Sequence, residues 1–260
     1  MSIHKLLADI YRNRELIWAL ALKELHVRYK RSALGFLWSL LNPLLMMIIL
    51  SVVFSTIVRI PVHQYAIFLM AALLPWTFLA QTLAYSADAL VMNGDLLKKV
   101  YVAKIVFPIA AVLSNIINFL LSMIPLVILM AVLRFPFHWT WIYLPVPMLG
   151  LILFATGLAF FCSAANVFFR DVAHILQVVL SAWFYASPVM YSLDFVPDRY
   201  RVFFRLNPML YILNGFRHAI YWGFFPSKAS VAGSLVVGVV TLMLGYAFFR
   251  RVQDSVVYYL

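Results

Sequence analysis

Charged residues and cysteines are scarce in this sequence. Asp, Glu, Lys and Arg make up 11% of its 260 residues and hydrophobic residues 65%, against about 25% and about 45–50% in soluble domains. A soluble domain of this composition would have too little polar surface to cover itself, which excludes an ordinary cytosolic enzyme and a disordered chain. The single cysteine, Cys162, cannot form an intramolecular disulfide, which excludes a disulfide scaffold. The composition therefore predicts an integral membrane protein.

Motifs of catalysis and ion coupling are also missing. The sequence has no G-x-x-x-x-G-K-[ST] loop, no G-x-S-x-G and no Cys or His pairs at metal-ligand spacing. One H-x-x-x-x-D pattern, His4 to Asp9, lies in an amphipathic segment and is expected by chance. The predicted spans lack the buried ionic groups of ion-coupled transporters. We therefore expect no metal or cofactor on this chain, and the energy for any transport must come from elsewhere.

Six apolar stretches are long enough to cross a bilayer as helices. A hydrocarbon core of about 30 Å needs about 20 helical residues, and a helix satisfies its own backbone groups in lipid. The stretches are residues 34–58, 65–87, 105–133, 139–165, 172–193 and 229–249, and none contains Asp, Glu, Lys or Arg. We predict one all-α domain with six transmembrane helices over residues 34–260, preceded by a cytoplasmic segment, residues 1–33.

Lys and Arg predict the orientation of the helices. With the N-terminus inside, the inner segments hold 13 of these residues and the outer segments hold 7. Five of the seven lie in one long loop, residues 194–228, and without it the comparison is 13 to 2. The positive-inside rule then places both termini in the cytoplasm. Residues 1–31 are charged throughout, so we expect no cleavable signal peptide.

Two inner segments carry apolar faces. Residues 3–31 combine apolar residues at helical spacing with Lys and Arg that can reach lipid headgroups. This pattern predicts an interfacial amphipathic helix, either a simple anchor or a collar that also contacts a partner. In the inner loop, Asn93-Gly94 predicts a turn and Asp95 a helix cap. The short helix 95–101 would expose an apolar side and a basic side, formed by Leu96, Leu97, Val100 and Tyr101 and by Lys98 and Lys99. An exposed apolar side favours a protein partner.

The outer loop is too apolar to be solvated and too rich in proline for another span. Two short helices, about 198–206 and 208–222, are predicted with a break at Asn207-Pro208. Such a hairpin can re-enter the membrane where protein or a water-filled cavity covers its polar groups.

Polar residues, most of them neutral, form stripes on or beside several spans. They are Asn42 near Trp38, then Thr77, Gln81, Tyr85 and Asp88, then Asn115, Asn118 and Ser122, and finally Asp171, His174, Gln177, Ser181 and Tyr185. Hydrogen bonds between helices are one explanation. Aromatic faces beside neutral hydrogen-bonding groups also suit a sugar chain, which must slide through many weak contacts. Small residues of the last span predict a close-packing face, namely Ser234, Gly238, Thr241 and Gly245.

Four blocks in order carry a family resemblance. They are Y-K-R-S-A-L-G-F-L-W-S-L-L-N-P-L (29–44), N-V-F-F-R-D-V-A-H-I (166–175), F-Y-A-S-P-V-M-Y (184–191) and L-N-P-M-L-Y-I-L-N-G-F-R (206–217). Over essentially its whole length, the chain resembles the membrane subunit of ABC-2-type polysaccharide exporters, which move O-antigen, capsule or teichoic acid chains. The resemblance is greatest to the O-antigen exporters.

The resemblance implies an assembly and several sites. It implies a homodimer in the bacterial inner membrane, with two copies of a separate ATPase that binds ATP and Mg²⁺. It implies that residues 95–101 are the coupling helix and that residues 194–222 form periplasmic gate helices, with Tyr191, Asp194, Asn207, Pro208 and Arg217 at the gate. It also implies a channel lined by the first, second and fifth spans, which agrees with the stripe residues Trp38, Asn42, Thr77, Gln81, Tyr85, His174, Gln177, Ser181 and Tyr185.

The function expected from these observations is ATP-driven export of undecaprenyl-linked polysaccharide, with this chain as channel. Arg170 and Asp171, just before the fifth span, are expected at its inner mouth, although ordinary helix capping by Asp171 is an alternative. An ABC-2 exporter of a drug or a lipid is a second interpretation. A membrane-embedded glycosyl or acyl transferase is a third, and the outer loop lacks the D-x-D motif that would favour it.

Overall fold

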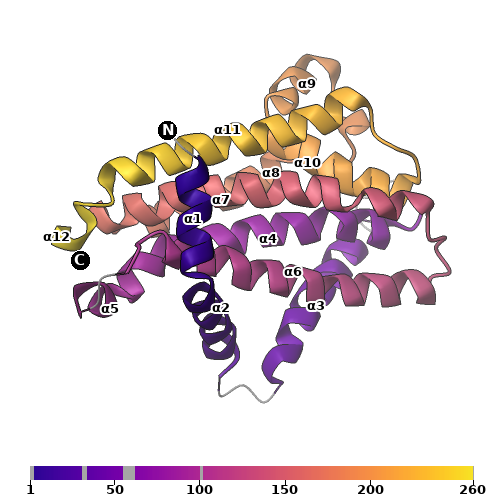
Figure 1. Cartoon of the computed structure of the whole chain (residues 1–260). Coiled ribbons are helices and arrows are strands. Elements are labelled where there is room, and N and C mark those ends of the chain that lie inside the picture. Colours follow the sequence, from indigo (N-terminus) through magenta and orange to yellow (C-terminus); the bar gives the residue numbers. More distant parts are fainter. Residues whose placement is uncertain (1–2, 31–33, 55–61, 100–101, 260) are drawn as a thin grey trace.

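The computed structural model describes residues 3–30, 34–54, 62–99 and 102–259, and this part of the chain contains helices and no β-strand (Figure 1). The longer helices are α1 (Ile3–Arg12), α2 (Arg14–Tyr29), α3 (Trp38–Val52), α4 (Tyr65–Met92), α6 (Val106–Val132), α7 (Pro145–Phe168), α8 (Val172–Ala186), α9 (Asp198–Arg205), α10 (Pro208–Arg217) and α11 (Lys228–Val252). The shorter helical elements are η1 (Gly35–Leu37), α5 (Gly94–Lys99), η3 (Trp139–Tyr143), η4 (Leu193–Phe195), η5 (His218–Trp222) and α12 (Val256–Tyr259). The predicted all-α class is confirmed.

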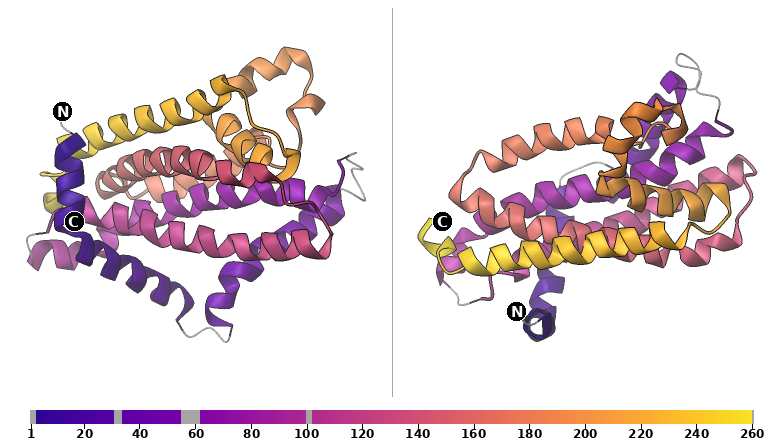
Figure 2. Two further views of the ribbon diagram at one scale, coloured as in Figure 1. Left: turned by 45° about the vertical axis from the view of Figure 1, so that its right-hand side comes forward. Right: turned by 90° about the horizontal axis from the view of Figure 1, so that it is seen from above.

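Four helical segments are long and apolar enough to cross a membrane, namely α4, α6, α11 and α7 together with η3. They run side by side in an elongated bundle (Figure 1 and Figure 2). The other two predicted spans contain shorter apolar helices, α3 and α8, of 15 residues each. The stretch 172–193 is not one continuous helix as predicted. Helix α8 ends at Ala186, because Ser187 is extended ahead of Pro188, whose ring disfavours helical backbone before it.

Small residues bring α7 and α11 into backbone contact. A Cβ atom added to Gly238 would lie 2.7 Å from the carbonyl oxygen of Gly150, and one added to Gly245 would overlap the backbone of Gly157. Small side chains let helix backbones approach closely where lipid removes the hydrophobic driving force for association. The close-packing face predicted for the last span is confirmed for Ser234, Gly238, Thr241 and Gly245.

The N-terminal segment forms two helices instead of the single one predicted. The chain turns at Asn13, whose Nδ2 donates to the carbonyl of Asp9 at 2.8 Å. Helix α1 runs across the end of the bundle that holds both termini (Figure 2). Helix α2 packs along α6, with Ile17 buried against Val106 and Ala110. The apolar face of α2 thus covers α6 of this chain, and the contact of the segment with the membrane interface stays a prediction.

The bundle has two distinct ends. The terminal end carries α1, α5 and α12, and the hairpin end carries α9, α10 and η5 (Figure 1). The two short helices predicted before the last span are confirmed, with their break at Asn207-Pro208. Asn207 accepts a hydrogen bond from the Met209 N–H, and Pro208 takes the first helical position, where no donor is needed. Helix α10 is buried against α4, α7 and α11, whereas α9 has no buried residue.

Helix α5 is the short helix predicted at 95–101, of which Val100 and Tyr101 lie outside the described residues. Leu97 is not exposed, contrary to the prediction. It is buried in a cluster with Leu90 and Val256, because the C-terminal α12 packs against α5. Leu96 packs at the edge of the same cluster. The side of α5 that remains exposed is charged and consists of Asp95, Lys98 and Lys99.

A candidate transport cavity

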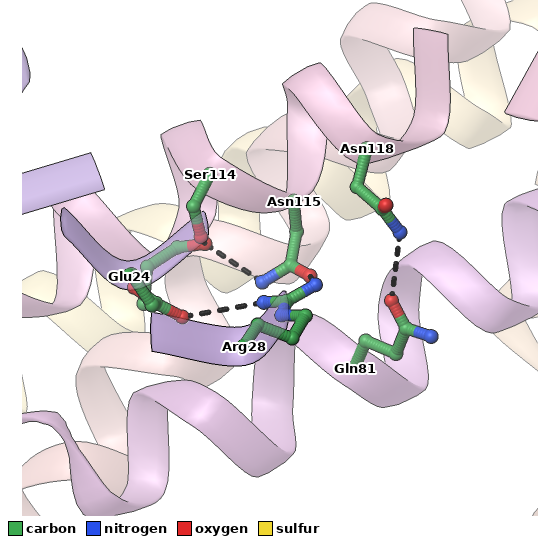
Figure 3. A network of polar contacts seen from close by, with 7 residues as sticks. Glu24, Arg28, Gln81, Ser114, Asn115 and Asn118 are labelled. Atoms are coloured by element: carbon green, nitrogen blue, oxygen red, sulfur yellow. Dashed lines mark hydrogen bonds and ion pairs between the residues drawn. The ribbon is translucent and has the colours of Figure 1, made fainter. Parts of the chain in front are cut away.

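A cavity of about 560 Å³ lies between α2, α3, α4, α6 and α8. It reaches half-way along the bundle, since Gln81 and Asn118 lie near the middles of α4 and α6. The Nδ2 of Asn118 donates to Oε1 of Gln81 at 3.1 Å (Figure 3). The described lining consists of Arg28, Trp38, Asn42, Pro43, Met46, Leu73, Trp76, Thr77, Ala80, Gln81, Tyr85, Asn118, Leu180, Ser181, Phe184 and Tyr185.

Seven of the nine residues expected to line a channel meet at this cavity. They are Trp38, Asn42, Thr77, Gln81, Tyr85, Ser181 and Tyr185. The other two, His174 and Gln177, are exposed on the first half of α8 and do not border it. The structure thus brings together side chains from three separate predicted spans around one space. Whether a polymer passes through that space stays a prediction.

The walls combine neutral polar groups with aromatic rings. The hydroxyl of Thr77 donates to the carbonyl of Leu73, and that of Ser181 donates to the carbonyl of Gln177, so each hydroxyl oxygen can still accept. Trp76 meets Trp183 edge to face, with ring centres 5.8 Å apart, and also packs against Phe184. Such a surface offers ring faces and single hydrogen bonds. Arg28 is the one ionic side chain among the described lining residues.

Arg28 belongs to a polar network that the sequence analysis missed. Its Nη1 donates to Oδ1 of Asn115 at 3.3 Å, and its Nη2 lies 3.4 Å from Oε1 of Glu24 (Figure 3). Burial raises the pKa of the Glu24 carboxyl above its ordinary value, while Arg28 and the Ser114 hydroxyl oppose this shift. The spacing of Glu24 and Arg28, four residues apart on one helix face, was a signal that could have indicated the pair. From the sequence, the basic residues of this segment are instead expected at lipid headgroups.

Two asparagines hold the ends of α8. At the terminal end, Asn166 of α7 accepts from the Ala173 N–H and donates to the carbonyl of Ala87 and to the carboxylate of Asp88. Asp171 makes no side-chain capping hydrogen bond with α8, and both Arg170 and Asp171 are exposed at the turn before it. The helix capping expected as an alternative role of Asp171 is provided by Asn166 instead.

At the hairpin end, Asn207 ties α8 to α10 by four hydrogen bonds. Its Oδ1 accepts from the indole N–H of Trp183 and from the Met209 N–H, both at 3.0 Å. Its Nδ2 donates to the carbonyl of Ala186 and to the hydroxyl of Ser187. Every donor and acceptor of the side-chain amide is thereby used. The residue predicted at the gate is thus a structural junction between the two helices.

The segment after α8 is held by a buried arginine. Arg217 is 1% exposed, and its Nη2 donates to the carbonyl of Val189 at 2.7 Å. Its guanidinium carbon lies 3.8 Å from the ring centre of Phe68, a cation–π contact. Tyr65 supports the same segment by donating to the carbonyl of Met190 at 2.7 Å. Of the other predicted gate residues, Tyr191 donates to the carbonyl of Tyr185, and Asp194 is exposed.

No group of three or more His, Cys, Asp or Glu residues in the described ranges could hold a metal ion. Comparison with known proteins identifies the chain's family. The ABC-2 type transporter family matches residues 15–221. The chain is 33% identical to the O-antigen export system permease protein RfbA of Myxococcus xanthus, over 96% of this chain and 97% of that protein. The chain belongs to the ABC-2 type transporter family and is a multi-pass membrane protein.

Two further relatives cover the chain to a similar extent. An O-antigen export system permease protein RfbA of Klebsiella pneumoniae is 26% identical over 92% of each chain. The polysialic acid transport protein KpsM of Escherichia coli is 24% identical over 91% of this chain and 93% of its own. The family resemblance seen in the four sequence blocks is therefore confirmed.

Proposed function

We propose that this chain is the channel-forming permease subunit of an ATP-driven exporter that moves a lipid-linked polysaccharide, such as O-antigen, across the bacterial inner membrane. The observation that carries the proposal is the cavity at mid-bundle, where neutral polar groups and aromatic rings meet in a member of the ABC-2 type transporter family. Relatives that cover nearly the whole chain are named for O-antigen export and polysialic acid transport.

The lining of the cavity suits a polymer that must slide. Trp38, Trp76 and Tyr85 offer ring faces for the C–H faces of sugars, and Gln81 and Ser181 offer single hydrogen bonds. Each of these contacts is weak, so one sugar can release a contact and the next sugar can form it as the polymer advances. A wall with many fixed positive charges would instead bind an acidic polymer tightly and hold it in place.

The proposed assembly is a homodimer with two copies of a separate ATPase, which binds and hydrolyses ATP with Mg²⁺. In this arrangement α5 is the coupling helix and meets the ATPase in the cytoplasm, where both termini also lie. Arg170 and Asp171 stand at the inner mouth. Helices α9 and α10 form the periplasmic gate, with α10 re-entering the membrane.

In the same arrangement α3 and α8 complete six spans. At 1.5 Å per residue, 15 helical residues extend about 22 Å, shorter than a hydrocarbon core of about 30 Å. The segment that follows α8, Ser187 to Met190, is buried under protein. The carbonyl of Val189 accepts from Arg217 of α10, and that of Met190 accepts from Tyr65 of α4. Non-helical backbone is tolerated at membrane depth under that condition.

An export assay with a blocked cavity tests the proposal. The chain and its ATPase are expressed in a strain whose own polysaccharide permease is deleted, and surface polymer is measured. The wild type should restore polymer, whereas Ser181→Trp should strongly reduce it because the indole obstructs the cavity. Val240→Trp, on the exposed side of α11, is the matched control and should export normally. A wild-type chain that restores no polymer, or a Ser181→Trp chain that exports as well as the control, would contradict the proposal and favour the drug or lipid exporter.

A further inference from the structure

Arg28 stands where two spaces of different character meet. On one side lies the transport cavity, whose described lining has no other ionic side chain. On the other side is a pocket of about 240 Å³ between α2, α4 and α6. Its wall is mostly apolar and includes Leu20, Val27, Ala89, Met92, Phe107 and Ala110, with Lys23, Glu24 and Asn93 as its other polar members. Arg28 and Tyr85 border both spaces. The order along this path is apolar pocket, guanidinium, then polar and aromatic cavity.

The guanidinium is buried but incompletely paired. The Arg28 side chain is only 9% exposed, and a guanidinium has five N–H donors. Its two hydrogen bonds, to Asn115 and Glu24, are long at 3.3 and 3.4 Å (Figure 3). Its Nε has no hydrogen-bond partner among the described residues. The guanidinium carbon lies 3.8 Å from the ring centre of Tyr85 on α4, a cation–π contact. A cation in this state can accept a further anionic ligand.

The chemistry of arginine selects the type of anion. Its planar fork matches the oxygens of a phosphate, and burial strengthens such a pair relative to water. While the site is empty, the Glu24 carboxylate balances the charge of Arg28. Its Oε1 lies 3.4 Å from Nη2 of Arg28, and a phosphate oxygen could approach the guanidinium more closely. Burial of Glu24 already weakens its ionised form, so its carboxylate is a poor competitor.

We propose that Arg28 binds the phosphate group that joins the polysaccharide to its carrier lipid, with the first sugars in the transport cavity and the start of the hydrocarbon in the apolar pocket. The inference rests on the proposed function, because a lipid-linked polysaccharide has the same order of parts as the path: hydrocarbon, phosphate, sugar. Arg28 then recognises the end of the polymer, while the neutral wall lets the remaining sugars slide.

Binding of undecaprenyl diphosphate tests the site directly. The full chain is placed in nanodiscs of phosphatidylcholine and titrated with this probe. The change in intrinsic tryptophan fluorescence, to which Trp38 and Trp76 in the cavity wall contribute, reports binding. Arg28→Gln should weaken binding about tenfold or more, the effect of losing a charge-assisted hydrogen bond to phosphate. Arg14→Gln is the matched control, since Arg14 begins the same helix, is exposed and contacts Tyr11. Its binding should stay within about twofold of wild type.

Glu24→Gln separates ligand binding from a structural role of the pair. If Glu24 competes with phosphate, this variant should bind the probe as tightly as wild type or several-fold more tightly. If the pair only fixes α2 on α6, both variants should bind equally poorly, and that result would overturn the proposal. Should Arg28→Gln fail to give monodisperse protein, Arg28→Lys replaces it. It keeps the charge but loses the fork, and it should bind more weakly than wild type.

Two competitors identify the source of the phosphate. Undecaprenol, which lacks phosphate, should bind wild type and Arg28→Gln equally. Phosphatidylglycerol should displace the probe only at much higher concentration, and displacement at equal concentration would mean an ordinary lipid headgroup site and sink the idea. The export assay remains independent. If wild type exports polymer and Arg28→Gln binds and exports as wild type does, this inference alone fails; if wild type exports none, the proposed function fails.

Discussion

At the scale of single residues, buried amides decide where α8 begins and ends. Asn166 lies before α8 in the sequence and Asn207 lies after it. Asn166 accepts from the Ala173 N–H at one end of α8. Asn207 accepts from the Trp183 N–H and donates to the carbonyl of Ala186 at the other end. Between these junctions α8 is exposed along much of its length (Figure 2). Its placement therefore depends on a few specific hydrogen bonds more than on extensive packing.

Replacing Asn207 should accordingly be costly. Asn207→Ala removes the cap of α10 and leaves the Trp183 N–H without its acceptor, and we expect a loss of about 2–4 kcal/mol in unfolding free energy. Thermal unfolding of the purified protein, followed by tryptophan fluorescence, measures the effect. Asn93→Ala is the control, because the side chain of Asn93 donates to the carbonyl of Ala89 within its own helix, and its loss should cost less than about 1 kcal/mol. Equal losses would contradict the junction role.

At the scale of elements, the contact between α7 and α11 is set by backbone proximity. Gly245→Ala places a methyl group into the backbone of Gly157 and should force the helices apart, at a cost of about 1–3 kcal/mol or more. Gly233→Ala lies on the same helix beside the Tyr211 ring at an ordinary contact distance of 3.5 Å, and it should be neutral or slightly stabilising. The melting temperatures of the two variants are measured in one detergent. A specific backbone contact lowers the melting temperature of Gly245→Ala alone, whereas loose packing would leave the two variants alike.

The corrected placement of Leu97 changes the expectation for α5. Because Leu97 is 7% exposed within this chain's own cluster, Leu97→Asp should destabilise the terminal end instead of simply uncoupling a partner. The double variant Lys98→Glu, Lys99→Glu changes only exposed residues. It should leave the fold intact and lower the amount of ATPase that co-purifies several-fold. Unchanged co-purification with this double variant would remove α5 from the coupling contact.

At the scale of the whole molecule, the exposed face of α8 fits the proposed homodimer. Ile175, Val178 and Val179 form an apolar surface there, next to the residues that line the cavity. A second copy packed against this face would enclose the cavity between two chains. The channel would then be a property of the dimer.

Cross-linking in native membranes tests this arrangement. In a Cys162→Ser background, Val178→Cys should form a disulfide-linked dimer under mild oxidation, because in the proposed dimer the two copies of this residue would lie close to the two-fold axis. Leu244→Cys on α11 is similarly exposed, 67% against 71% for Val178, and should remain monomeric. Gel mobility without reductant reads both out. Equal cross-linking would indicate random collision, and no cross-linking of Val178→Cys, with Ile175→Cys also negative, would place the interface elsewhere.

Local patterns were enough to predict most of the elements. Long apolar runs marked α4, α6, α7 and α11, because lipid requires a continuous helix of about 20 residues. The break at Asn207-Pro208 and the small face on α11 were also readable, since proline geometry and the absence of a side chain act on nearest neighbours. Seven of the nine residues expected to line a channel meet at one cavity, because helical periodicity puts such residues of each helix on one face.

The sequence by itself thus determined the helices, their polar faces and the family. The tertiary structure alone decided which faces are covered and by what. Leu97 is buried by α12, and Arg28 is buried by α6 and Tyr85 between two pockets. Both outcomes depend on segments far apart in the chain, and no local periodicity encodes such contacts. For the same reason a basic residue that looked like a lipid-headgroup contact became the one ionic group in the described wall of the cavity.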